Sequence, residues 1–179
     1  MRIQIIPGKS LSIKDIKSID EIKAREFKVP PMNQKQIKNS IYFLLKDDGE
    51  IKAIGQLVKI NGIKIDNDVY SILGIGGIVS NVKLRGYGRK ILASIKNYLG
   101  KNHITGVGYC RKRNKEFYLK CGINVDCSLN PRLVYVKGRK RITNTRDHCI
   151  IYYEAGSKLI AYLQKNSKSI ALLPRYPNW

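Results

Sequence analysis

One segment carries most of the structural information in this chain: IVSNVKLRGYGRKIL, residues Ile78–Leu92. Its first residues complete a nearly continuous apolar run from Val69 to Ser80, which is typical of a strand buried on both faces. After the turn, apolar residues recur at helical spacing as far as Leu99, and Gly100 follows. The segment therefore predicts a buried strand, a turn with two glycines, and an amphipathic helix over residues 88–99.

The turn has the composition of an anion-binding site. Gly86 and Gly88 allow a tight turn and remove Cβ atoms that would block a ligand. The first amides of the following helix lack partners within the helix and lie at the positive end of its dipole, and Arg85, Arg89 and Lys90 add charge around them. The turn thus predicts a pyrophosphate cradle. Glycines that serve geometry alone are the alternative, and the third glycine and downstream acid of a dinucleotide fingerprint are absent.

The remaining pattern predicts one α/β domain over residues 1–179, with 166–179 as a loop or tail, built as a mixed sheet with helices on both faces. Ser12 and Asp15 indicate a helix start, Asp47-Asp48-Gly49-Glu50 a hairpin turn, and Asn61-Gly62 a second turn. The first helix is expected to bury Ile13, Ile16, Ile19, Ile22 and Ala24. The expected strands are residues 2–6, 41–45, 51–60, 63–65, 69–80, 103–110, 132–136 and 148–153, and the expected helices are 12–27, 34–39, 88–99 and 114–120.

The chain is strongly basic, with 34 Lys and Arg against 13 Asp and Glu and a net charge of +21. Between Lys83 and Arg141 there are 16 basic residues and two acids. Apart from a solvated basic surface, this excess indicates an anionic partner: nucleic acid, an anionic membrane or a polyphosphate cofactor. The longest uncharged run, Val69–Val82, is 14 residues, too short for a membrane span of about 20. With no signal peptide at its start, the chain is expected to be cytoplasmic and not membrane-bound.

The four cysteines and two histidines do not form a metal-site pattern. Cys110, Cys121, Cys127 and Cys149 include no C-x-x-C pair, and the histidines lie far apart in the sequence. No metal is therefore expected, and the cysteines are expected to be reduced and mostly buried.

Two motifs in the right order resemble the GNAT superfamily of acetyl-coenzyme A-dependent N-acetyltransferases. Lys83-Leu84-Arg85-Gly86-Tyr87-Gly88 fits the family motif Q/R-x-x-G-x-G/A, with Lys83 as the departure, and Ile91-Leu92 stand where an aliphatic pair belongs. Phe117-Tyr118-Leu119-Lys120-Cys121-Gly122-Ile123 is similar to the family's F-Y-x-K-x-G-F, with Ile123 replacing the last aromatic residue. The resemblance covers residues 69–123.

The resemblance implies a mostly antiparallel central sheet with a splayed central strand, and acetyl-coenzyme A as co-substrate. It places Ile78 and Val79 along the pantetheine arm and makes Tyr118 the general acid that protonates the departing thiolate. Asn114 either holds the cofactor arm or caps its own helix. The cofactor-binding residues implied are Ile78, Val79, Leu84, Arg85, Gly86, Tyr87, Gly88, Arg89, Lys90 and Asn114.

The resemblance leaves the general base and the acceptor open. Leu73 occupies the position of the glutamate base used by the histone-acetyltransferase branch, so Glu50, Asp68, His148 and Glu154 are the candidates, unless the amine arrives neutral. The first hypothesis for the acceptor is a primary amine of a small molecule or peptide. The alternatives are an RNA-borne amine such as aminoacyl-tRNA, with the basic runs 111–113 and 137–141 holding phosphates, or a non-catalytic nucleic-acid-binding protein on the same fold. Many members of the family pair, so a homodimer is also considered.

Overall fold

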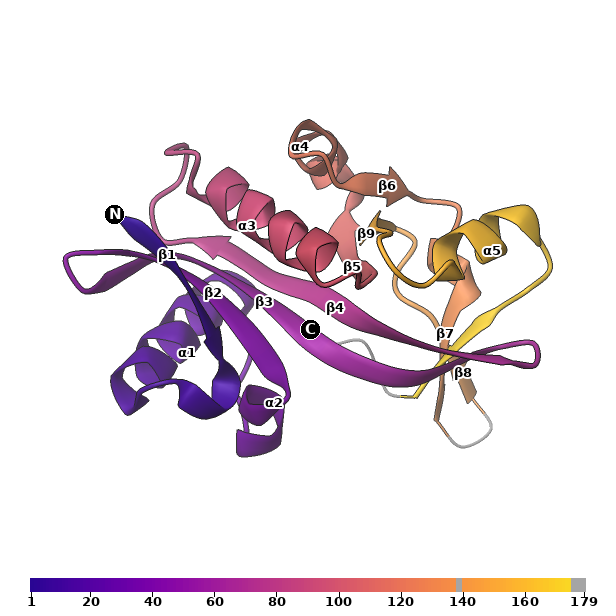
Figure 1. The fold of residues 1–179 in the computed structure, drawn as a ribbon, viewed down its shortest axis with the longest axis horizontal. Coiled ribbons are helices and arrows are strands. Elements are labelled where there is room, and N and C mark those ends of the chain that lie inside the picture. The colour runs from indigo at the N-terminus through magenta and orange to yellow at the C-terminus, as the bar shows by residue number, and fades with distance from the viewer. Residues whose placement is uncertain (138–139, 175–179) are drawn as a thin grey trace. The chain divides into compact units, whose positions relative to one another are not determined.

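The computed structural model describes residues 1–137 and 140–174 (Figure 1). These residues divide into two compact units, one formed by Met1–Val58 with Gly76–Tyr98 and the other by Lys59–Ile75 with the chain from Leu99 onward. The helices are α1 Ile13–Phe27, α2 Gln34–Lys38, α3 Tyr87–Lys101, α4 Lys115–Lys120 and α5 Leu159–Lys165, with short 3-10 turns at Gly8–Ser10, Lys112–Asn114 and Asn130–Arg132. The strands are β1 Arg2–Pro7, β2 Ser40–Asp47, β3 Glu50–Ile65, β4 Asp68–Ser80, β5 Gly106–Arg111, β6 Asn124–Asp126, β7 Leu133–Lys137, β8 Lys140–Ile142, β9 His148–Tyr153 and β10 Ala171–Leu173.

In the first unit, helices cover both faces of the strands. β1 pairs antiparallel with β2, and β2 pairs antiparallel with β3. Successive side chains of a strand point to opposite faces, and Gly55 and Gln56 of β3 show this directly. A Cβ built on Gly55 would lie 2.4 Å from Ile91 of α3, whereas Gln56 accepts a hydrogen bond from Lys23 of α1. The expected arrangement of helices on both faces is confirmed here.

Helix α1 is turned differently from the sequence expectation. Ser12 accepts a hydrogen bond from the Asp15 amide at 3.0 Å, so the predicted N-cap is confirmed. However, Ile13 is 75% exposed and Ala24 is also exposed, so the expected apolar face is wrong at both ends. The residues of α1 that are buried are Ile19, Ile22 and Lys23.

The second unit contains the strand order β6-β9-β5-β4-β3-β10-β7-β8, to which β3 and β4 contribute their parts from Lys59 to Ile75. The β4–β5 and β7–β10 pairs are parallel, whereas the β5–β9, β6–β9, β7–β8 and β3–β10 pairs are antiparallel. β4 pairs with β5 only over Leu73–Ile75, while β5 pairs with β9 over six residues. A short β4–β5 ladder is what a splayed central strand requires.

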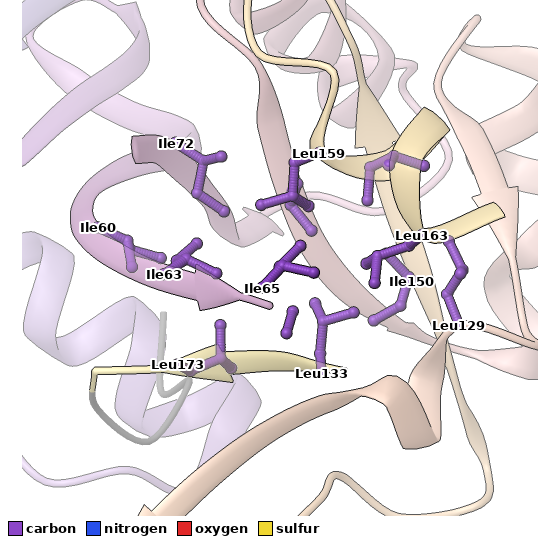
Figure 2. Close-up of a cluster of buried hydrophobic side chains, with 13 residues drawn as sticks. Ile60, Ile63, Ile65, Ile72, Leu129, Leu133, Ile150, Leu159, Leu163 and Leu173 are labelled. Carbon is purple, nitrogen blue, oxygen red and sulfur yellow. The ribbon is translucent and has the colours of Figure 1, made fainter. Parts of the chain in front are cut away.

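The second unit is built around an aliphatic cluster. Figure 2 shows side chains from β3, β4, β7, β9, β10 and α5 pointing toward one another. Helix α5 supplies Leu159, Ile160 and Leu163, each at most 1% exposed. The carboxylate of Glu154 accepts hydrogen bonds from the amides of Ile160 and Ala161, which are among the free amides at the start of that helix.

Several sequence expectations are corrected by these elements. Asn61-Gly62 does not form a turn, because β3 runs unbroken through it to Ile65 and the chain reverses at Asp66 and Asn67. Residues 171–173 of the expected tail form β10, and residues 175–179 lie outside the described part. β6, β8 and α5 were not expected.

The expectation of four reduced cysteines is wrong for one pair. Cys127 and Cys149 form a disulfide, while Cys110 is a buried free thiol and Cys121 a partly buried one. Burial raises the pKa of the Cys110 thiol to about 11. Among the described residues, no group of three or more His, Cys, Asp or Glu side chains is placed to hold a metal ion, and no helix is both long and apolar enough to cross a membrane.

Candidate functional site

The loop between β4 and α3 presents backbone amides to open space. Leu84 and Gly86 both have positive φ, 61° and 71°, which is unusual for leucine and permitted for glycine. The first helical bond in this turn runs from the Lys90 amide to the Gly86 carbonyl at 3.2 Å, so the amides of residues 87–89 have no partner within the helix. A Cβ added to Gly86 would meet no atom within 4 Å. The side of the loop at Gly86 is therefore free for a ligand.

Polar contacts join the same loop to α1 and β3 of the first unit. Lys83 Nζ lies 2.7 Å from Glu26 Oε2 of α1, and Arg25 donates to the Asn81 side chain at 3.1 Å. The Asn81 amide also donates to the Lys52 carbonyl of β3 at 2.9 Å. Lys83, the departure from the family motif, thus takes part in anchoring the loop.

Three cations at the loop have no such contact. Arg85, Arg89 and Lys90 are exposed, and within the described residues their side chains make no ion pair or hydrogen bond. Unpaired cations beside unpaired amides are the donor set that a pyrophosphate requires. The residues at this turn therefore fit the phosphate group of a nucleotide cofactor.

Ile78 and Val79 lie in β4 immediately before this loop. Val79 is buried in a cluster with Ile19 and Ile22 of α1, whereas Ile78 approaches Gly55 on the side covered by α3. Gly77, just before them, has φ +58°, and such a residue interrupts an ordinary strand. β4 is therefore irregular at Gly77, immediately before Ile78 and Val79.

Tyr118 belongs to the second unit, in α4. It is 8% exposed and packs edge-to-face against Phe117, with ring centroids 5.3 Å apart. Burial, with smaller contributions from Cys110 and Cys121, raises the pKa of the Tyr118 hydroxyl well above its ordinary value. Tyr118 therefore keeps its proton at neutral pH, as a proton donor must. Asn114 precedes α4, and its side chain makes no capping hydrogen bond, so the capping alternative is not realised.

The four candidate general bases are already engaged. Glu50 pairs with Lys52 at 2.6 Å, and this hydrogen bond and charge lower its pKa. Asp68 accepts from Tyr70 at 3.4 Å, and His148 Nδ1 lies 2.5 Å from the Thr145 hydroxyl. Glu154 caps α5. None of the four stands as an unengaged proton acceptor.

Lys23 is a buried polar residue that the sequence pattern did not single out. This lysine is 6% exposed and lies on the buried side of α1, where its Nζ donates to Gln56 Oε1 at 2.5 Å. The signal was present in the sequence, because Lys23 follows Ile19 by four residues and so shares its helix face.

The basic runs differ in what the structure describes. The side chains of Arg111, Lys112 and Arg113 are exposed at the end of β5 and make no ion pair or hydrogen bond with another described residue. The backbone there is fixed, since the Lys112 amide donates to the Asp147 carbonyl at 2.8 Å. Of the run 137–141, residues 138 and 139 lie outside the described part.

Comparison with solved structures relates this architecture to known proteins. An acyl-CoA N-acyltransferase from Pseudomonas aeruginosa superposes with a TM-score of 0.58 at 14% identity, covering 85% of this chain and 97% of that one. The chain has the GNAT fold. Escherichia coli ElaA superposes with a TM-score of 0.57 at 13% identity, over 86% of this chain and 99% of its own. A Bacillus subtilis acetyltransferase in complex with CoA superposes with a TM-score of 0.56 at 12% identity, over 86% of this chain and 97% of its own.

The likeness to GNAT proteins is one of fold, because these identities are low. No protein-family model matches the sequence, and no curated protein matches it. At the level of the fold, the predicted resemblance to the GNAT superfamily is confirmed, and so is the predicted mixed, mostly antiparallel α/β architecture. In this GNAT fold, the glycine loop belongs to the first unit, whereas Tyr118 and Asn114 belong to the second.

Proposed function

We propose that this protein is an N-acetyltransferase that moves the acetyl group of acetyl-coenzyme A to a primary amine of a small molecule or peptide. The observation that carries the proposal is the loop before α3, where amides without helical partners, open space at Gly86 and the unpaired cations Arg85, Arg89 and Lys90 occur together on a GNAT fold. A Bacillus subtilis protein with this fold was solved in complex with CoA.

The proposed roles of the residues rest on the family resemblance together with their positions in the chain. The amides of residues 87–89, with Arg85, Arg89 and Lys90, would hold the pyrophosphate, while Leu84 and Tyr87 shape the loop and Ile78 lines the pantetheine arm. Acetyl-coenzyme A supplies the activated thioester. The backbone N–H of Val79 would donate to the carbonyl oxygen as its negative charge grows, and Asn114 would hold the arm. Tyr118 would give its proton to the departing sulfur.

Thermal denaturation with added ligand tests the cradle. At a concentration 100 times its Kd, acetyl-coenzyme A should stabilise the protein by about 2.7 kcal/mol, which corresponds to roughly 5–10 °C in Tm. Acetylpantetheine, which lacks the pyrophosphate, should give a much smaller shift. Equal shifts would show that the loop does not bind phosphate, and no shift with either compound at about 1 mM would reject the proposal. Transfer is then measured over a mixed panel of amines, peptides and aminoacyl-tRNAs.

An RNA-borne amine is the second candidate acceptor. It is favoured by Arg111, Lys112 and Arg113, three exposed and unpaired cations five to seven positions before Tyr118. Each phosphate contact releases counterions, so the affinity for RNA falls as the salt concentration rises. In a plot of log K for single-stranded RNA against log salt concentration, the triple variant R111Q/K112Q/R113Q should have a slope that is smaller in magnitude by about 2. The control is K158Q/K165Q/K168Q, which removes three exposed lysines of the same unit. Equal slopes for the two variants would remove this candidate, and RNA binding without transfer to any amine would favour a non-catalytic nucleic-acid-binding protein.

A further inference from the structure

Lys23 is a lysine buried without a counter-ion. Its Nζ donates to Gln56 Oε1 at 2.5 Å and to Met32 Sδ at 3.3 Å, and it lies 5.8 Å from the centre of the Tyr42 ring. No carboxylate among the described residues forms an ion pair with it. The nearby Asp20 carboxylate instead accepts a hydrogen bond from the Met32 amide at 3.1 Å. Because burying an unpaired charge is costly, this site favours the neutral amine.

The groups that face Lys23 agree with this assignment. Burial lowers the pKa of Lys23 to about 8, and Asp20 of α1 opposes the shift only partly. Burial raises the pKa of Tyr42 on β2 to about 12, so this neighbour stays neutral. Gln56 on β3 and Met32 carry no charge. At pH 7.5 about a quarter of Lys23 would then be unprotonated, compared with about one in a thousand for an exposed lysine.

Lys23 also lies beside the irregular part of β4. A Cβ placed on Gly77 would be 3.2 Å from Lys23 Cε and 3.3 Å from the Gln56 side chain. Val79, two residues further along β4, is buried in one cluster with Ile19 and Ile22, which precede Lys23 on α1 by four positions and one position. The amine is thus held against the strand whose Val79 amide is proposed to face the thioester. All of these residues belong to the first unit.

We infer that Lys23 is an internal acetyl acceptor, which takes the acetyl group from bound acetyl-coenzyme A when no external amine is present. The inference rests on the proposed function, because Lys23 is buried and lies against β4, the strand along which the donor is proposed to bind. The lone pair of Nζ forms a bond to the acetyl carbonyl carbon, and the carbon–sulfur bond breaks. Nζ releases one proton and the coenzyme A thiolate takes one up, leaving N6-acetyl-Lys23 and coenzyme A.

The product suits the site better than the starting amine does. Acetylation removes the possibility of a buried positive charge, and the remaining amide N–H can still donate to Gln56 Oε1. The added group requires space, and the neighbouring Met32 is only partly buried and has a side chain that adapts readily.

The test is to incubate the purified protein with isotopically labelled acetyl-coenzyme A and to locate the label by mass spectrometry. Cleavage after glutamate releases residues 22–26, in which Lys23 is the only lysine. Lys17, exposed on the same helix, is the internal control. At pH 7.5 the label should enter Lys23 at least about tenfold faster than Lys17, because only Lys23 would receive the acetyl group from a bound donor. The rate at Lys23 should level off above about pH 8. Excess unlabelled coenzyme A should suppress labelling of Lys23 and leave Lys17 unchanged.

Binding of acetyl-coenzyme A is measured on the same sample, so that the two ideas can fail separately. If the ligand does not bind, the proposed function is wrong and the inference falls with it. If the ligand binds but residues 22–26 carry no label, only the inference is wrong. Labelling of Lys23 that excess coenzyme A does not suppress would also overturn it, since the acetyl group would then not come from the bound donor.

Discussion

Lys83 Nζ and Glu26 Oε2 lie 2.7 Å apart and join residues 57 positions apart in the chain, so α1 and the loop before α3 are held together. Both side chains are partly exposed, and such a pair contributes about 0–1 kcal/mol to stability. The pair matters more for the charge of the loop, because Glu26 neutralises Lys83. The unpaired cations of the loop are then Arg85, Arg89 and Lys90, which are the ones proposed to bind phosphate.

Substituting Gly86 with alanine should weaken acetyl-coenzyme A binding by about tenfold. Gly86 has φ +71° with nothing within 4 Å of a built Cβ, so the effect arises from backbone strain of roughly 1–2 kcal/mol and not from a clash. Gly49 has φ +78° and equally open space, in the turn between β2 and β3. Gly49→Ala should therefore lower the stability of the protein about as much as Gly86→Ala does, without affecting acetyl-coenzyme A binding. Thermal denaturation measures the stability, and calorimetry measures the binding. Equal affinities for the two variants would argue against the loop as the phosphate site.

Replacing Tyr118 with phenylalanine should lower kcat for acetyl transfer by about 100-fold or more, since general acid catalysis contributes at least that much. The packing of the buried ring is retained, so the affinity for acetyl-coenzyme A should not change. Tyr70→Phe, which removes a hydroxyl that contacts Asp68 instead, should leave kcat unchanged. Steady-state rates are measured with an amine that the panel identifies as an acceptor. If Tyr118→Phe had the same kcat as the unaltered protein, Tyr118 would not be the general acid.

The stability of the protein should depend on pH through Lys23. Its pKa is lowered from 10.5 to about 8 in the folded state, so the unfolded chain binds the extra proton between these values. The free energy of unfolding should therefore rise with pH in this window, by up to about 1.4 kcal/mol per pH unit. Below pH 8 the full penalty of the buried charge applies.

Lys23→Met removes this titration and keeps an unbranched side chain that is only one atom shorter. Urea unfolding of both proteins from pH 8 to pH 9.5 should show the unaltered protein gaining stability relative to the variant. The window stops there because Tyr42, with its raised pKa, lowers the stability of both proteins once the unfolded tyrosine ionises near pH 10. If the free energy of unfolding changed with pH in the same way for both proteins, Lys23 would not be held in its neutral form.

Reducing the Cys127–Cys149 disulfide should lower the free energy of unfolding by about 3 kcal/mol. The bond closes a segment of 22 residues, and its chief effect is to restrict the unfolded chain. Denaturation with and without dithiothreitol measures the loss. The double variant C127S/C149S is the control, and a reductant effect of the same size in that variant would show that another group is responsible.

Local pattern in the sequence was enough to predict β1, α1, the β2–β3 hairpin, β4 and α3, because their apolar spacing and turn residues act within a few positions. The loop before α3 was predicted for the same reason, since Gly86 and Gly88 stand next to the helix that they precede. The short elements β6, β8, β10 and α5 were missed. Three-residue strands form only because a distant partner supplies the ladder, as β7 does for β10.

Side-chain environments were decided by tertiary structure alone. The sequence shows Lys23 as one of many lysines, and only the packing of α1 against Gln56 and Gly77 removes it from water. Cys127 and Cys149 likewise become partners because β9 returns beside β6. The chain by itself determined the fold class and the composition of the phosphate loop, whereas contacts between residues far apart in the sequence decided which cations are paired, which are exposed and which amine is buried. Charge and reactivity depend on those surroundings, and no local pattern encodes them.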